Sequence, residues 1–214
     1  MPPLKRLHPA QDLFTLYVFV SVLFVVGVVF GAIMYNALTL EQQQQVTGEV
    51  GRYADMFRAG IMPDPADTFR DRALFHTKWI VLIWLLGATV VGMPFILALD
   101  FLKGVLIGFS VGTLIQEHAW QGVLFAFAAI APPNLLVIPA LIMASVAGIA
   151  FSLHVVKKRL LQSGGELAHP LLSHTAVCLF MLLVLWGAAL LEGYLSPQLI
   201  RLAAPVLGAA AGGL

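Results

Sequence analysis

Residues 92–139 read GMPFILALDFLKGVLIGFSVGTLIQEHAWQGVLFAFAAIAPPNLLVIP and decide the class of fold. Charged residues are scarce in this stretch, between long runs of Leu, Ile, Val, Phe and Ala. Across the whole chain 60% of residues are hydrophobic and 11% are charged, whereas soluble domains carry about 25% charged residues. Several apolar runs also reach the roughly 20 residues that a helix needs to cross a bilayer. The composition therefore predicts an all-α, polytopic integral membrane bundle.

Working outward, apolar runs separated by polar residues predict about five spans within a single membrane domain, residues 1–214. The basic start followed by an apolar run also fits a signal peptide. We interpret this run as a span instead, because it is too long for a signal peptide and no clear cleavage site closes it. The predicted spans are residues 13–38, 79–99, 101–115, 135–156 and 171–191.

Asp100 and Lys103 lie at the junction of the second and third predicted spans, three residues apart and therefore on one helical face. They fit either a sharp turn at the membrane boundary or a pair inside the bundle, where ionisable residues are rare and functional. We expect the boundary turn. Pro94 should kink the second span, because proline supplies no backbone N–H.

Residues 122–131 are apolar but too few to cross a bilayer. Pro132, Pro133 and Asn134 follow directly, and two consecutive prolines interrupt the hydrogen bonding of a helix. Backbone groups freed at membrane depth must be satisfied by protein or line a cavity. The segment is therefore predicted to be a re-entrant half-helix or part of a broken span, with the break at these three residues.

Glycines spaced four apart predict close helix packing, because small residues let two backbones approach. The predicted helix-packing positions are Gly27, Gly31, Gly104, Gly108 and Gly112.

The same glycines form part of a second pattern, since Gly108, Ser110 and Gly112 match the G-x-S-x-G nucleophile motif. That motif needs a strand-to-helix turn, which is missing here. His154 and His174 would be the bases available to an intramembrane serine protease. We favour helix packing as the role of these glycines, with Ser110 as a further small residue on the same helix.

The polar outer segment, residues 39–76, should hold a juxtamembrane helix. Thr39 and Gln42 match a capping box, and Asp64 followed by Pro65 should start the next helix. Apolar residues of the first helix fall on one stripe that is a candidate partner-docking face: Val46, Val50, Tyr53 and Phe57. The alternative is that this amphipathic helix lies on lipid headgroups or packs on its own bundle.

Basic residues next to spans indicate orientation. The raw count of Lys and Arg is balanced between the two sides. The cluster Lys157, Lys158 and Arg159 directly follows the fourth span and favours a cytoplasmic amino terminus with the carboxyl terminus outside.

Other chemistry is weakly represented. The net charge of +1 without a basic face gives no indication of nucleic-acid binding. His76, Glu117 and His118 are scattered ligand types without the close spacing of a metal site, and Glu192 is interpreted as a solvated helix-end residue. We therefore predict no metal, no cofactor and no catalytic residue, and a chain that is not an enzyme.

Four segments resemble the stage II sporulation protein M family of spore-forming bacteria. They are YVFVSVLFVVGVVFGA in the first span, IWLLGATVVGMP in the second, FLKGVLIGFSVG in the third and PPNLLVIPA before the fourth. The resemblance implies a multi-pass scaffold in the mother-cell membrane at the sporulation septum, needed for engulfment of the forespore. The implied partners are two cell-wall hydrolases, stage II sporulation proteins D and P.

A small transporter or channel-like protein is the second hypothesis, because transporters build substrate sites on discontinuous helices such as the one predicted at Pro132–Asn134. The scarcity of buried charge and the lack of duplicated halves count against it. Under either hypothesis the lipid bilayer is a partner, and homo-oligomerisation is left open.

Overall fold

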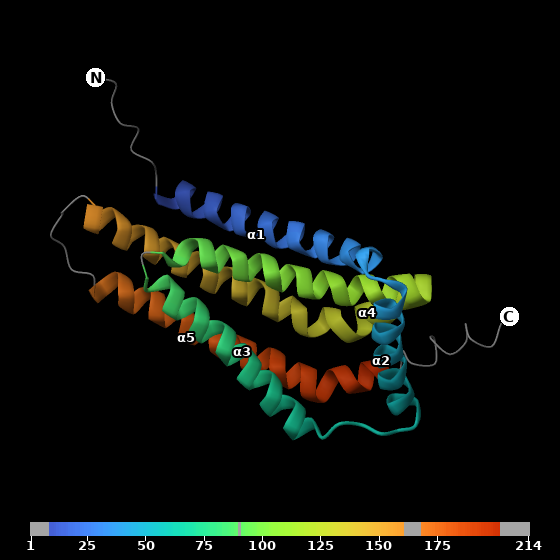
Figure 1. The fold of residues 1–214 in the computed structure, drawn as a ribbon. Coiled ribbons are helices and arrows are strands. Elements are labelled where there is room, and N and C mark those ends of the chain that lie inside the picture. The colour runs from blue at the N-terminus through green and yellow to red at the C-terminus, as the bar shows by residue number, and fades with distance from the viewer. Residues whose placement is uncertain (1–8, 90, 161–167, 202–214) are drawn as a thin grey trace.

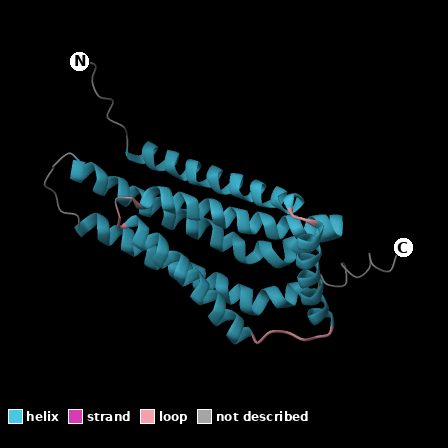
Figure 2. Cartoon of the chain, viewed as in Figure 1, coloured by secondary structure: helices cyan, strands magenta, loops and turns pink. Residues whose placement is uncertain are grey.

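The computed structural model describes residues 9–89, 91–160 and 168–201, and within these ranges the chain is helical without a strand (Figure 2). This confirms the predicted all-α bundle. The elements are α1 (Pro9–Met34), the 3₁₀ turn η1 (Tyr35–Ala37), α2 (Leu40–Arg58), α3 (Pro65–Gly87), α4 (Gly92–Leu160), α5 (Ala168–Leu190) and the π-helical turn η2 (Leu191–Leu195).

The long helical segment α4 doubles back on itself. The Ser145 hydroxyl donates to Asp100 Oδ1 at 2.7 Å, although the two residues are 45 positions apart. A straight helix rising 1.5 Å per residue would separate them by about 68 Å. Figure 1 shows the outgoing and returning arms side by side. The chain therefore reverses between the two candidate membrane spans of α4, Gly92–Gln116 and Ile130–Val156.

Four segments of the described chain are long and apolar enough to cross a membrane: Leu13–Ala37, Gly92–Gln116, Ile130–Val156 and Ala168–Arg201. Helix α3 runs beside α4 and α5 but is not among them. Its first half carries four charged residues: Asp67, Arg70, Asp71 and Arg72. The start of α1 and the end of η2 lie at opposite ends of the bundle, and α2 crosses the end near η2 (Figure 1).

The helix ends around α2 follow the predicted capping chemistry. The Thr39 backbone N–H donates to Gln42 Oε1 at 3.1 Å and the Gln42 N–H donates to Thr39 Oγ1 at 3.3 Å, which confirms the capping box. Gly60, with φ 75°, follows the end of α2. The Asp64 carboxylate accepts from the Ala66 N–H at 2.8 Å and caps α3, which begins at Pro65 as predicted.

The predicted boundary turn at Asp100 and Lys103 is wrong. The turn lies between the end of α3 and the start of α4, where the Thr89 N–H donates to the Leu86 carbonyl at 2.9 Å and the Gly92 N–H donates to the Thr89 carbonyl at 3.3 Å. Residues 92–99, assigned above to the second span, therefore belong to α4.

Pro94 consequently kinks no span. It lies in the first turn of α4, where backbone N–H groups have no partner within the helix. A proline at this position removes no hydrogen bond.

The predicted break at Pro132, Pro133 and Asn134 is also wrong, because α4 stays helical through all three residues. Proline is tolerated in membrane helices where neighbouring groups satisfy the freed backbone. Asn134 Nδ2 donates to the Ile130 carbonyl at 2.7 Å and ties this turn together. Residues 122–131 are therefore helical backbone leading into the return arm of α4 and not a re-entrant half-helix.

Two buried clusters hold the arms together. The larger joins α3, the return arm of α4 and α5: Ile80, Ile83, Val137, Ala140, Leu141, Ala144, Cys178, Met181, Leu185 and Ala188. The smaller joins α1 to both arms of α4: Val20, Ile96, Val146 and Ile149. A further contact brings backbones together, since a Cβ on Gly87 would lie 2.8 Å from Gly148 Cα.

The five predicted packing glycines lie in one helix–helix contact, between α1 and the outgoing arm of α4. A Cβ on Gly27 would overlap the Phe101 carbonyl, and one on Gly31 would lie 2.8 Å from the Phe109 nitrogen. From the other side, a Cβ on Gly108 would lie 2.7 Å from the Val28 carbonyl carbon. The remaining two glycines, Gly104 and Gly112, meet the backbones of Phe24 and Ala32.

Candidate functional site

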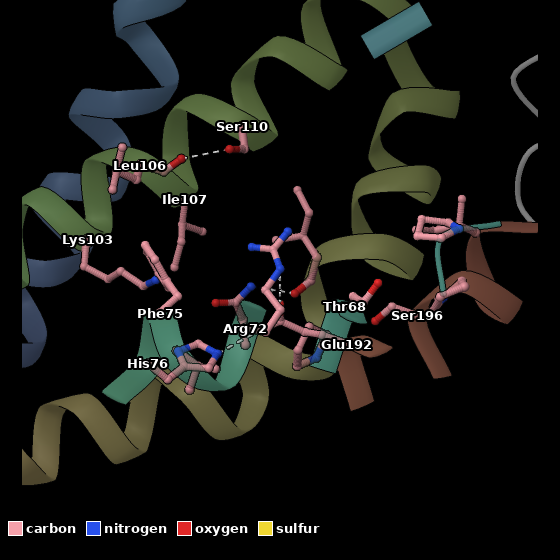
Figure 3. Close-up of a pocket in the computed structure, with 17 residues that line it drawn as sticks. Thr68, Arg72, Phe75, His76, Lys103, Leu106, Ile107, Ser110, Glu192 and Ser196 are labelled. Carbon is pink, nitrogen blue, oxygen red and sulfur yellow. Dashed lines mark hydrogen bonds and ion pairs between the residues drawn. The ribbon is translucent and has the colours of Figure 1, made fainter. Parts of the chain in front are cut away.

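A cavity of about 380 Å³ lies between α3, both arms of α4 and η2, and we call it the polar cavity (Figure 3). Eight polar side chains from these segments line it: Thr68, Arg72, His76, Lys103, Ser110, Asn134, Glu192 and Ser196. Ionisable groups inside a membrane bundle are costly to bury and usually have a function. The polar cavity is therefore the candidate site.

Glu192 is the centre of an ion cluster in this cavity. Its carboxylate lies 3.0 Å from Arg72 Nε and 3.2 Å from His76 Nε2. The side chain of Glu192 is 17% exposed and that of His76 only 3% exposed. Arg72 and His76 are four residues apart on α3, so one helical face presents both to the carboxylate.

The local fold of η2 and α3 places Glu192 there. A Cβ on Gly193 would lie 2.8 Å from the Pro65 carbonyl oxygen, so the missing side chain lets the start of α3 pack directly on η2. Along the same interface Trp186 Nε1 donates to Thr77 Oγ1 at 3.1 Å. π-helical turns such as η2 occur frequently at functional sites.

Lys103 faces the cluster across the cavity in Figure 3. Its ammonium lies 4.9 Å from the ring centroid of Phe75 and 5.4 Å from that of Trp79, which are cation–π distances. In the described part of the chain no carboxylate lies within ion-pair distance of it. Among the described residues, Lys103 is thus a buried cation without an ion-pair partner.

Asp100 and Lys103 both lie inside the bundle, as the alternative hypothesis for them required, but they do not pair with each other. Asp100 is buried and accepts from Ser145, while its Oδ2 atom has no hydrogen-bond partner in the described part of the chain. The two residues serve different contacts on the outgoing arm of α4.

Ser110 and the two candidate bases do not form a catalytic pair. The Ser110 hydroxyl donates to the Leu106 carbonyl of its own helix at 2.9 Å. His154 and His174 line a second cavity of about 350 Å³, where His174 stacks on Phe151 at 5.5 Å. Neither of these histidines lines the polar cavity that Ser110 faces, whereas the two glycines of G-x-S-x-G make the close helix contacts described above.

We therefore expect Ser110→Ala to leave function intact. The substitution removes one hydrogen bond within a helix and creates no cavity, because the side chain is exposed. Complementation of a strain that lacks the gene, with membrane levels of the variant compared with wild type, would check this. Loss of function at normal membrane levels would restore the catalytic hypothesis.

The candidate metal ligands are not brought together where the structure describes them. His76 binds Glu192, and the side chains of Glu117 and His118 lie outside the described part. No group of three or more His, Cys, Asp or Glu residues suited to a metal ion occurs among the described residues.

The predicted docking stripe can be placed only in part. Val46 is half-buried on α2, and the side chains of Val50, Tyr53 and Phe57 lie outside the described part of the structure.

The residues of the predicted helix break are in a different place. Pro133 and Asn134 line the polar cavity as helical residues of α4.

Glu192 and Arg72 are site residues that the sequence did not reveal. Glu192 follows an apolar span directly, which is a position typical of a solvated residue at a helix end. Two signals pointed towards a site: Lys103 within apolar sequence, and the helical spacing of Arg72 and His76. Their meeting with Glu192 depends on a contact between residues 116 positions apart.

An all-helical bundle with several membrane-crossing segments and a polar cavity between its helices defines a polytopic membrane protein. Residues 20–197 match the model of the family described as stage II sporulation protein M, and the chain belongs to this family. It is a sporulation-related membrane protein. No curated protein and no solved structure gives a significant match to the chain.

Proposed function

We propose that the protein is a non-enzymatic scaffold in the septal membrane that anchors peptidoglycan-degrading enzymes during engulfment of the forespore. The family resemblance names the expected partners, stage II sporulation proteins D and P. The observation that carries the proposal is α2, a polar helix that crosses one end of the bundle (Figure 1) and whose described side chains are mostly exposed.

Three features support α2 as a docking element. It is closed by a capping box at one end and a glycine at the other, so it is a formed helix outside the apolar core. Most of its described side chains are exposed. Its sequence also carries the apolar stripe from Val46 to Phe57, and apolar and aromatic anchors supply most of the binding energy at interfaces.

The scaffold requires α2 on the side where the wall lies. The basic cluster Lys157–Arg159 closes the return arm of α4 at the opposite end of the bundle from α2. Cytoplasmic loops are enriched in Lys and Arg. This supports a cytoplasmic amino terminus, with α2 and the polar cavity towards the outer side.

We expect a reporter that is active only in the cytoplasm to be inactive when fused after Leu214. The reason is that the start of α1 and the end of η2 lie at opposite ends of the bundle (Figure 1). The same reporter fused before Met1 should be active. Activity of the carboxyl-terminal fusion would contradict the proposed topology.

The docking proposal is tested by replacing Tyr53 and Phe57 together with Ser. Losing two interface anchors should lower recovery of the two hydrolases with the purified protein by at least about tenfold, since each anchor contributes about 2 kcal/mol or more. The matched control is Gln44→Ser with Glu49→Ser, on the polar face of the same helix. Undiminished recovery with the folded double variant would place the docking surface elsewhere.

A transporter or channel-like protein is the second candidate, and the polar cavity is the observation that favours it. Ionisable residues facing a cavity inside a bundle mark solute or ion pathways in many membrane proteins. Such a pathway would use Lys103, Glu192 and Asn134 without a helix break. Solute-dependent currents from reconstituted protein, abolished by Lys103→Met, would support this candidate over the scaffold.

A further inference from the structure

We propose that the polar cavity binds the phosphate group of an anionic ligand. The first reason is the balance of charges among the residues that line the cavity. Arg72 and Lys103 are cations, and the single carboxylate of Glu192 is already engaged by Arg72 and His76. The site therefore has one positive charge that the described residues do not balance.

Lys103 supplies this unbalanced charge at a place where it is costly. The side chain is only 9% exposed and belongs to a segment long enough to cross the membrane. The faces of Phe75 and Trp79 compensate the ammonium in part, but buried charges are normally paired with an opposite charge. An anion in the cavity would provide that pair.

Two more buried atoms of cavity residues have no partner among the residues that the structure describes. They are the Ser196 hydroxyl and His76 Nδ1, and both residues line the polar cavity. Buried polar atoms almost always have a hydrogen-bond partner. A phosphate group offers several acceptor oxygens, which can accept from the Lys103 ammonium and the Ser196 hydroxyl at the same time.

The rest of the cavity suits a phosphate attached to an apolar group. Aliphatic residues from both arms of α4 and the end of the described chain line it beside the charged residues: Leu106, Ile107, Ile130, Val137 and Ile200. Its volume of about 380 Å³ falls within the range of about 300–1,000 Å³ for small-ligand sites. A phospholipid headgroup and free phosphate share the recognised chemistry, and the experiment distinguishes them.

The test uses the full chain in nanodiscs of phosphatidylcholine, with and without phosphatidylglycerol. Native mass spectrometry measures retained lipid, and the midpoint of thermal unfolding reports stabilisation. Phosphatidylglycerol should be retained selectively and raise the midpoint. Lys103→Met should weaken this binding by about tenfold or more, because it removes a charge-assisted contact. Lys78→Met, an exposed cation outside the cavity lining, should leave it unchanged.

A second variant separates loss of binding from a folding defect in Lys103→Met. Ser110 lines the cavity and is exposed, so Ser110→Asp adds a repelling charge without emptying the core, while Ser110→Ala is its neutral control. In a separate arm, inorganic phosphate is titrated into phosphatidylcholine nanodiscs. Stabilisation by phosphate that is lost in Lys103→Met or Ser110→Asp identifies free phosphate as the ligand. Binding of neither ligand, or equal binding by folded Ser110→Asp and wild type, would overturn the proposal.

Discussion

Gly108→Leu is expected to eliminate the folded protein from the membrane. A Cβ at Gly108 would lie 2.7 Å from the carbonyl carbon and 2.8 Å from the Cα of Val28, and a leucine side chain extends well beyond its Cβ. Both contacts are backbone atoms, which cannot rotate away as a flexible side chain can. Helix α1 must therefore move off α4, and the packing along the whole glycine contact is lost with it.

The measurement is the amount of folded, monodisperse protein after extraction. Gly108→Ala adds only the Cβ and should lower this amount less than Gly108→Leu does. Gly187→Leu in α5 is the matched control, because a Cβ there meets no atom within 4 Å. This control should accumulate as wild type does, since leucine also has a higher helix propensity than glycine. Equal accumulation of Gly108→Leu and Gly187→Leu would contradict the packing argument.

The glycine spacing shows how much of the fold the sequence could predict. Residues four apart lie on one helical face, so Gly104, Gly108 and Gly112 had to form a flat surface for a close neighbour. The spacing does not indicate which helix that neighbour is. The structure identifies the neighbour as α1, because the backbone carbonyls of Phe24 and Val28 occupy the space that side chains would fill.

The turn between α3 and α4 could not be predicted from composition. Ala88, Thr89 and Val91 are as compatible with a span as with a turn, whereas Asp100 and Lys103 were the charged residues of the stretch. Charge usually marks a membrane boundary, and here tertiary contacts override that rule. Ser145 satisfies one oxygen of Asp100, and two aromatic rings cover Lys103.

The candidate site was predictable only in fragments for a related reason. A lysine within apolar sequence indicates a functional position wherever it lies in the bundle. An acid at a helix end indicates nothing by itself, because most such residues are solvated. Glu192 becomes part of a site through Gly193, which lets α3 approach and brings Arg72 and His76 to the carboxylate.

Glu192→Gln is accordingly expected to cost about 1–3 kcal/mol of folding free energy. The estimate lies between the roughly 0–1 kcal/mol of an exposed ion pair and the roughly 3–5 kcal/mol lost when a buried pair is broken. The Glu192 side chain is 17% exposed, but that of Arg72 is 54% exposed and can rehydrate. Removal of the carboxylate also leaves Arg72 and Lys103 as uncompensated like charges around one cavity.

The midpoint of thermal unfolding in phosphatidylcholine nanodiscs should fall by several degrees. Glu49→Gln is the matched control, because the ion pair of Glu49 with Arg52 on α2 has side chains that are 71% and 72% exposed. The folding free energy of that variant should stay within about 0.5 kcal/mol of the wild-type value, as it does for most surface substitutions. Equal shifts in the two variants would mean that the Glu192 cluster contributes no more than a surface pair. A larger shift in Glu192→Gln alone would show that this carboxylate holds α3 against η2.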